Sequence, residues 1–264
     1  MKYENLQKYL DSLLSKGELI FSKSEAMLAL GVSDAAFRNS LKRQSASKKV
    51  IRLIGGCYLI VPIEFRQLGL VPPELFIDDL MKYLDLEYYV ALLSAASFFG
   101  ATHQAAQNFH VMVRKTIKPI RIGKFSIVFH VNKDLSTTPT QSIKTDRGTL
   151  IVSTVEATCL DLIKYFHQSG NFNHIATVLD EMCEGININE LLNQLDSSPL
   201  LAIQRLGYIL EILNLTSVSE SLGKYLRKRK PLFYSPLAPQ NSKLGSKKNK
   251  KWHLIINEEI ESDL

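Results

Sequence analysis

The sequence has few cysteines and no long apolar run. Its three cysteines, Cys57, Cys159 and Cys183, are odd in number and far apart, and no CxxC pair occurs. This spacing argues against a disulfide framework or a zinc site and fits a reducing cytoplasm. The longest nearly apolar stretch, residues 88–101, is too short to span a bilayer, and the acidic residues near the N-terminus do not fit a signal peptide. We therefore expect a soluble, cytoplasmic protein.

The common motifs of enzymes are also missing. The sequence has no GxxxxGK[ST] phosphate loop, no GxGxxG after a strand pattern, no GxSxG elbow and no HExxH. The six histidines do not cluster as metal ligands do, and His110 and His130 fall in strand patterns, where hydrogen-bonded structural roles are expected. We expect no catalytic residue, no cofactor and no metal.

Two polar pairs are the remaining candidates for chemistry. Glu156 and Asp161 lie five residues apart on an expected helix and point about 140° apart, which suits a first-turn Glu and a surface Asp better than an acid–base pair. His103 and Gln104 follow an apolar stretch and could line a pocket mouth or tie down the next loop. A nuclease would need an Asp followed by Glu-x-Lys on adjacent strands, and we find none.

Charge is distributed unevenly along the chain. Residues 1–62 carry a net charge of +5, residues 63–220 carry −5, residues 221–252 carry ten basic residues without an acid, and the last twelve residues add four acids. Basic ends around an acidic middle are expected where the ends meet nucleic acid and the middle has another role.

The stretch 21–61 predicts two helices followed by a hairpin. Ser24 is expected to cap the first helix, with Leu28 and Leu30 on its apolar side, and Ser33 to cap the second after a turn at Gly31. VIRLI and CYLIV then read as strands joined by Gly55 and Gly56. Helix-turn-helix followed by a hairpin is the winged-helix arrangement.

The second of these helices and the hairpin form a candidate DNA interface. Phe37 and Leu41 face a core, while the rest of the surface is basic and has no acid from Arg38 to Arg52. We expect Asn39 and Arg43 to reach base edges, Arg38 and Lys42 to flank them, and the wing region to hold phosphates. A winged helix that only contacts protein is the alternative. The candidate DNA-binding residues are Arg38, Asn39, Lys42, Arg43, Lys48, Lys49 and Arg52.

The chain divides by pattern into four segments. We expect a winged-helix domain (1–62), a connector (63–74), an α/β domain (75–225) and a basic, partly extended or mobile tail (226–264), in an α+β fold. Within the α/β domain, residues 88–104 read as one buried helix, residues 109–113, 120–123, 125–131 and 149–154 as strands, residues 134–148 as a surface loop, and Thr154 as a helix cap. Residues 252–259 could form a final strand.

With these segments in place, the chain resembles the AbiEi antitoxins of bacterial type IV toxin–antitoxin, or abortive-infection, systems. The resemblance covers residues 20–215 and rests on four stretches: GGCYLIVP (55–62), YYVALLSAASFFGATHQ (88–104), VSTVEATCLDLI (152–163) and QRLGYIL (204–210). None of them is catalytic, but their order and spacing together are specific.

The resemblance implies a bifunctional protein active in phage defence. Its winged helix would bind inverted repeats in its own promoter as a transcriptional repressor, and its C-terminal domain would counter a nucleotidyltransferase-like toxin without forming a stable complex with it. The alternative is a winged-helix transcription factor with a ligand-sensing C-terminal domain.

Overall fold

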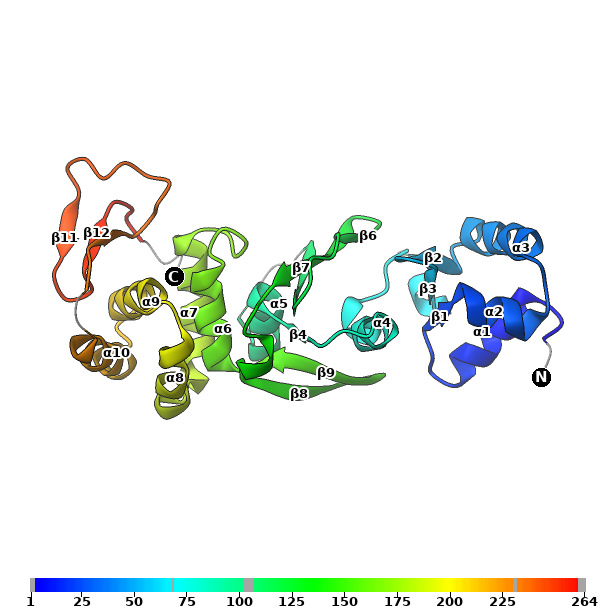
Figure 1. The fold of residues 1–264 in the computed structure, drawn as a ribbon, viewed down its shortest axis with the longest axis horizontal. Coiled ribbons are helices and arrows are strands. Elements are labelled where there is room, and N and C mark those ends of the chain that lie inside the picture. Colours follow the sequence, from blue (N-terminus) through cyan, green and yellow to red (C-terminus); the bar gives the residue numbers. More distant parts are fainter. Residues whose placement is uncertain (1–2, 68, 102–106, 230–231, 261–264) are drawn as a thin grey trace. The chain divides into compact units, whose positions relative to one another are not determined.

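The computed structural model describes residues 3–67, 69–101, 107–229 and 232–260 (Figure 1). The chain forms two compact units whose segments alternate along the sequence. Unit 1 comprises Met1–Val90, Gln107–Leu135 and Ser142–Val152, and unit 2 comprises Ala91–Ala106, Ser136–Gln141 and Ser153–Leu264. The division does not test whether the four predicted segments fold independently, so their boundaries stay a prediction.

Unit 1 begins with three helices and a small sheet. The helices are α1 (Leu6–Ser15), α2 (Lys23–Leu30) and α3 (Asp34–Ala46), and the strands are β1 (Ile20–Ser22), β2 (Val50–Arg52) and β3 (Cys57–Ile60). The strands pair antiparallel in the order β1-β3-β2. This arrangement is compatible with a winged helix-turn-helix.

An aromatic cluster fills the core of this segment. Phe21 and Tyr58 stack with ring centroids 5.3 Å apart, Tyr9 meets Phe21 edge-on, and Phe37 reaches Tyr58 from α3. Leu41, one turn after Phe37, packs against the same cluster, as its spacing predicts. The core face of α3 is therefore fixed by two residues on one side of the helix.

Two expectations about α2 are wrong. Ser22, not Ser24, caps this helix, in a capping box with Glu25: the Ser22 hydroxyl accepts from the Glu25 backbone N–H at 3.0 Å and the Glu25 carboxylate accepts from the Ser22 backbone N–H at 3.1 Å. With the helix capped at Ser22, Ala26 faces the core. Leu28, which was expected on the apolar side of the helix, is 84% exposed.

The hairpin β2–β3 turns at the two expected glycines. Gly55 and Gly56 have φ of 52° and 87°, and the Cys57 N–H donates to the Ile54 carbonyl at 2.7 Å. Two successive positive φ angles are those of a type I′ turn, which matches the right-handed twist of the flanking strands. This part of the prediction is confirmed.

A short helix and a mixed six-stranded sheet follow in the chain. After 3₁₀ turns at Ile63–Phe65 and Pro73–Leu75 comes α4 (Ile77–Tyr83). The sheet has the order β6-β7-β5-β4-β9-β8 and contains both parallel and antiparallel pairs. Its strands are β4 (Tyr88–Val90), β5 (Asn108–Val113), β6 (Ile120–Ile122), β7 (Phe125–Val131), β8 (Thr140–Thr145) and β9 (Gly148–Ser153).

Two elements of this region differ from the sequence prediction. Residues 88–104 do not form one helix: β4 is followed by α5 (Leu92–Ala96) and a 3₁₀ turn at Ser97–Phe99. The stretch is buried as expected, but a strand with neighbours on both sides is also apolar throughout, so burial alone does not separate the two structures. The expected loop 134–148 contains β8, whose polar side chains are mostly exposed.

Unit 2 is a set of helices around α9 (Leu200–Ile212). This helix packs against α6 (Val155–Lys164), α7 (Phe172–Met182) and α10 (Thr216–Lys228), while α8 (Ile188–Gln194) contacts α6 and α10. Thr154 caps α6 by accepting from the Ala157 N–H, as expected, and α6 ends at Lys164.

The described part of the basic tail is partly extended, as expected, and its strands form a small sheet. Its strands are β10 (Ser235–Pro236), β11 (Lys247–Asn249) and β12 (Leu254–Ile256), in the order β10-β12-β11, with β12 inside the stretch expected to be a final strand. Trp252 is fully buried, and its ring lies where a Cβ on Gly207 of α9 would come within 2.0 Å. The sheet is therefore anchored on α9.

The described residues thus confirm a mixed α and β protein with several sheets. None of the helices in this part of the chain has the length and apolar character needed to cross a bilayer.

Candidate nucleic-acid interface

The exposed face of α3 is centred on Asn39. At 100° per residue, Asn39 lies about 160° from both core-facing side chains, Phe37 and Leu41, and Arg43 lies about 40° from Asn39. Asn39, Lys42 and Arg43 are all exposed. Three exposed alanines share or border this face (Ala35, Ala36 and Ala46), and their small side chains leave room for a close approach of the helix to another surface.

Arg38 is set apart from this face by an acid. Its guanidinium lies 2.8 Å from the Asp34 carboxylate, one turn earlier, and Asp34 also pairs with Lys23 at the start of α2. The hydrogen bond from Lys23, and then the charge of Arg38, hold the pKa of Asp34 below its ordinary value. Arg38 therefore belongs to an ion-pair network at the start of α3, where its acid partner competes with any phosphate.

The end of α3 presents two lysines in different environments. Lys48 is exposed and has φ of 54°, and the Lys49 N–H donates to the Gln44 carbonyl at 2.9 Å, as in a Schellman motif. The Lys49 ammonium donates to the Gln7 side chain on α1 at 2.8 Å and is half-buried. Lys48 is thus directed to solvent, whereas Lys49 ties α3 to α1.

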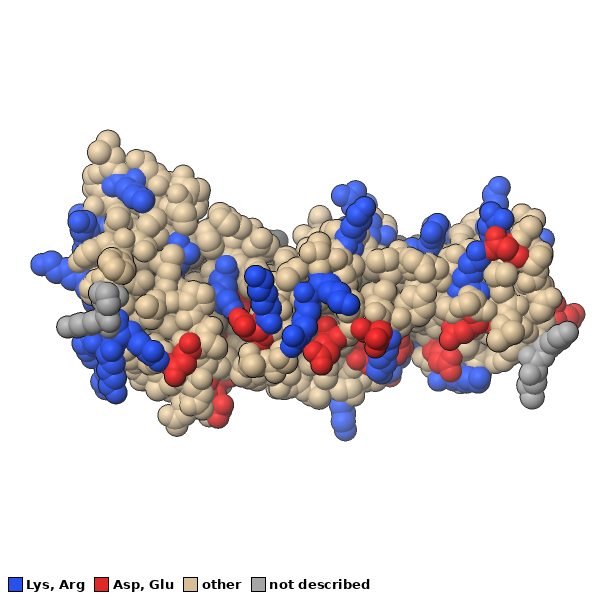
Figure 2. Space-filling model, viewed as in Figure 1, with Lys and Arg blue, Asp and Glu red and all other residues tan. Residues whose placement is uncertain are grey.

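Arg52 lies on β2, which is an edge strand of the small sheet, and its side chain is exposed. The tip of the same hairpin is approached by α4, since the Tyr83 hydroxyl donates to the Gly55 carbonyl at 3.3 Å. Figure 2 shows Lys and Arg side chains over the α3 end of this segment. Of the seven predicted DNA-binding residues, the structure therefore exposes six and engages Lys49 in an internal hydrogen bond.

The exposed face of α3, with its alanines, could have been predicted from the sequence, because the positions on one face of a helix follow from its period of 3.6 residues. The contacts of Asp34 with Lys23 and of Lys49 with Gln7 could not be read from the sequence, since each joins two different helices. These contacts set Arg38 and Lys49, which have partners within the segment, apart from the other basic residues of the candidate interface.

The two carboxylates considered for chemistry, Glu156 and Asp161, are both buried. Glu156 is 7% exposed and accepts the backbone N–H of Asn187 at 2.8 Å, and Asp161 is 3% exposed rather than a surface residue as expected. The expectation for Asp161 is wrong because the apolar spacing of α6 does not show that packing covers the helix all round. His103 and Gln104 lie outside the described residues.

His110 and His130 interact on neighbouring strands of the large sheet. The His110 Nδ1 and His130 Nε2 atoms are 2.8 Å apart, and burial and then the neighbouring His130 lower the pKa of His110 to about 4. The pair therefore remains neutral near pH 7, as structural histidines do. Within the described ranges, no group of three or more His, Cys, Asp or Glu residues could hold a metal ion.

The three cysteines are buried and free. The sulfurs of Cys159 and Cys183 lie 3.9 Å apart, and the hydrogen bond between them and their burial raise the pKa of Cys159. They act as small buried side chains between α6 and the end of α7.

Comparisons with known proteins place this fold. Residues 89–212 match the family model described as the AbiEi antitoxin C-terminal domain. The chain is similar to the crystal structure of the RV2827C protein from Mycobacterium tuberculosis, with a TM-score of 0.70 and 14% identity over 97% of this chain and 92% of that chain. The solution structure of the antibiotic-resistance factor ANT(2'')-Ia matches over 58% of this chain and 94% of that chain, at 9% identity. Its TM-score of 0.30 is too low to indicate a shared fold. The curated proteins contain no match.

The fold and the family match define a mixed α/β protein that carries an antitoxin domain. Residues 89–212 are similar to the C-terminal domain of the AbiEi antitoxins, which confirms the resemblance for that part of the sequence. The similarity to the mycobacterial structure shows a shared fold across nearly the whole chain.

Proposed function

We propose that residues 3–62 form a winged helix that binds duplex DNA through α3. The observation that supports this most strongly is the exposed face of α3, where Asn39, Lys42 and Arg43 lie among alanines with no acid between them. Asn pairs with adenine and Arg with guanine edges in the major groove, and a helix with small residues between these side chains can enter that groove.

In this proposal the basic residues divide into two roles. Asn39 and Arg43 read base edges, with Lys42 and Arg38 beside them, and Lys48 and Arg52 hold phosphates at the end of α3 and on the edge strand β2. Lys49 contributes a phosphate contact only if it leaves Gln7. Arg38 reaches DNA only in competition with Asp34.

The second part of the proposal concerns the antitoxin role. The match of residues 89–212 supports an antitoxin that acts against a toxin partner. We place it in a type IV abortive-infection system, where it counters a nucleotidyltransferase-like toxin without a stable complex, and where the winged helix represses its own promoter at inverted repeats. Neither role requires catalysis or a cofactor, and we assign no catalytic residue.

Binding to promoter DNA tests the first part. We expect Arg43→Ala to weaken binding to the promoter duplex by roughly 1–3 kcal/mol while binding to random duplex changes little, because alanine cannot reach the base edge that arginine reads. Arg121→Ala, an exposed arginine on β6, is the matched control and should bind as the wild type. An equal loss on both duplexes would reassign Arg43 to a phosphate contact.

Growth rescue tests the second part. Co-expression of the full chain should restore growth of cells that express the adjacent gene as toxin. Failure to rescue, with promoter binding intact, would contradict the antitoxin role and favour the alternative, a repressor whose C-terminal domain senses a ligand.

A further inference from the structure

The C-terminal sheet presents an outward face that combines aromatic, apolar and basic side chains. In its register, Ile255 pairs with Pro236 on one side and with Lys248 on the other, so these three residues share a face. Leu254, the neighbour of Ile255, is fully buried and marks the opposite face as the inner one. The face of Ile255 therefore points outward.

Two rings extend this outward face. The rings of Tyr234 and His253 lie 5.2 Å apart, and the Lys248 ammonium lies 5.2 Å from the centre of the Tyr234 ring. The residue before Tyr234, Phe233, is 76% exposed. Large exposed aromatic side chains are unfavourable in water. The exposed rings of Phe233 and Tyr234, with Lys248 beside Tyr234, therefore indicate a binding surface.

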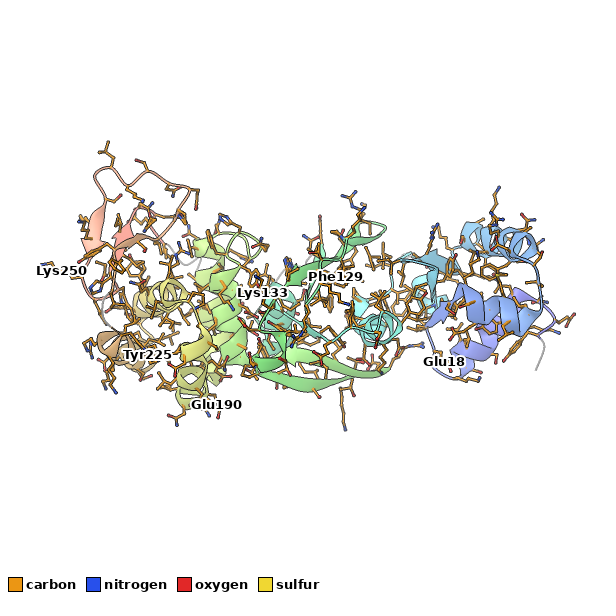
Figure 3. The ribbon with its side chains drawn as sticks, in the orientation of Figure 1. Glu18, Phe129, Lys133, Glu190, Tyr225 and Lys250 are labelled. Carbon is orange, nitrogen blue, oxygen red and sulfur yellow. The ribbon has the colours of Figure 1, made fainter. Side chains whose placement is uncertain are left out.

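The charge around this face is of one sign. Lys248 on the edge strand β11 and Lys250 just after it are exposed, whereas Lys247, which is also exposed, pairs with Ile256 and lies on the face of Leu254. Figure 2 shows blue side chains around this strand, and in Figure 3 Lys250 points away from the rest of the chain. No acid occurs in the sequence from residue 221 to residue 257.

Other basic residues of the tail are used to hold the structure. Lys251 lies 2.5 Å from the Glu211 carboxylate of α9, and Arg229 pairs with Asp196. For Lys248 and Lys250 no ion pair is found among the described residues, so their charges are available to an external partner. An anionic partner follows from the charge, and the exposed rings favour one that also has flat aromatic groups.

We propose that this surface, formed by Phe233, Tyr234, Lys248 and Lys250, binds single-stranded nucleic acid. Unpaired bases can stack on aromatic side chains while lysines follow the phosphates, and this combination tolerates many sequences. In a duplex the bases are already stacked on one another, so the rings gain little there. The surface is distinct from the exposed face of α3.

The test measures fluorescence anisotropy of labelled RNA and DNA single strands of about 12 nucleotides, and of a duplex of the same length. All proteins are full-length and carry Asn39→Ala and Arg43→Ala, so that α3 does not dominate the signal. We expect Phe233→Ser with Tyr234→Ser to weaken single-strand binding by about tenfold and duplex binding by less than about twofold, because serine offers no ring on which a base can stack.

Two further variants separate stacking from charge. Lys248→Gln with Lys250→Gln should weaken binding to every probe and lower the salt dependence on single strands by roughly 0.7 in slope for each phosphate that is no longer neutralised. Leu244→Ser removes a 94% exposed aliphatic side chain from the same tail and should change nothing. Unchanged fluorescence of Trp252, the only tryptophan, shows that each variant keeps the sheet in place.

Three results would overturn the proposal. The first is single-strand binding that does not depend on the two aromatic residues, and the second is an equal loss on duplex, which would mean phosphate contacts alone. The third is displacement of the labelled RNA by polyglutamate as effectively as by unlabelled RNA, which would identify an acidic polypeptide as the partner.

Discussion

At the scale of single residues, Gly207 explains part of the QRLGYIL stretch. A side chain at this position of α9 would overlap the ring of Trp252, whose nearest atoms lie 2.0 Å, 2.3 Å and 2.7 Å from the Cβ position. Glycine normally weakens a helix interior, so its presence here is required by the close approach of the tryptophan. A residue of the matched antitoxin domain thus accommodates a residue of the tail beyond it.

We predict that Gly207→Ala displaces Trp252 and destabilises the protein by roughly 1–3 kcal/mol, because the added methyl group overpacks a filled site. Urea unfolding gives the free energy, and a red shift of the emission of the single tryptophan reports its displacement. Gly185→Ala, where nothing lies within 4 Å of the added Cβ, is the control. Equal stability and unshifted emission would contradict the packing.

Lys48 is a second residue whose backbone decides its behaviour. Its φ of 54° is unfavourable for any residue with a Cβ, so we expect Lys48→Gly to stabilise the protein by about 1 kcal/mol and Lys48→Ala not to do so. If Lys48 holds a phosphate, both variants weaken duplex binding equally and lower the salt slope by roughly 0.9. Thermal unfolding and salt titrations measure the two effects, and weaker binding by only one variant would refute the phosphate contact.

Residues that act locally are the most predictable from the sequence. Ser33, Gly55, Gly56 and Thr154 adopt their expected roles because a cap or a tight turn depends on a few consecutive residues. The prediction for Leu28 is wrong because the apolar side of a short helix depends on what packs against it. The engagement of Lys49 by Gln7 depends on another helix and has no signal in the sequence.

At the scale of elements, whether a stretch forms a helix, a strand or a loop is harder to predict than whether it is buried. Four of the six strands of the large sheet fall at expected positions, whereas the sequence of β4 predicts a helix because it is apolar on both faces, and that of β8 predicts a loop because it is polar. The C-terminal segment has the composition of a mobile segment, since its strands are short and residues 243–251 are rich in lysine. The sheet is held in place by Trp252 and Lys251, which bind Glu211 on α9, about 40 residues earlier in the sequence.

The anchoring of this sheet should depend on pH through Glu211. Its carboxylate accepts hydrogen bonds from Lys251 and from the indole N–H of Trp252. Burial raises the pKa of Glu211, but these two hydrogen bonds outweigh burial and hold the pKa below its ordinary value of 4.5. A lowered pKa in the folded state contributes stability that is present above the unfolded-state pKa and is lost as pH falls through the folded-state pKa.

We therefore predict that tryptophan emission changes as pH falls below about 4.5 and that Glu211→Gln removes this transition. The glutamine keeps an acceptor for the indole but does not titrate. Glu220→Gln, an exposed residue of α10, is the control and should keep the wild-type profile. Identical pH profiles for the wild type and Glu211→Gln would exclude Glu211 as the titrating anchor.

At the scale of the whole molecule, the two compact units are not successive in the sequence. The chain passes between them several times, through residues 91–106 and 136–141. The fold is nonetheless shared with the mycobacterial structure over 97% of this chain. Because the units interleave, deletion of a segment tests function poorly, and point substitutions within the full chain are the better tool.

The final prediction separates repression from toxin neutralisation in the full chain. Asn39→Ala with Arg43→Ala changes only exposed side chains of α3, so we expect it to abolish repression of a promoter reporter while growth rescue stays at the wild-type level. Arg121→Ala should retain both activities. Loss of rescue together with repression, at unchanged protein level and thermal stability, would mean that the α3 face also acts on the toxin and that the two functions are not carried by separate surfaces.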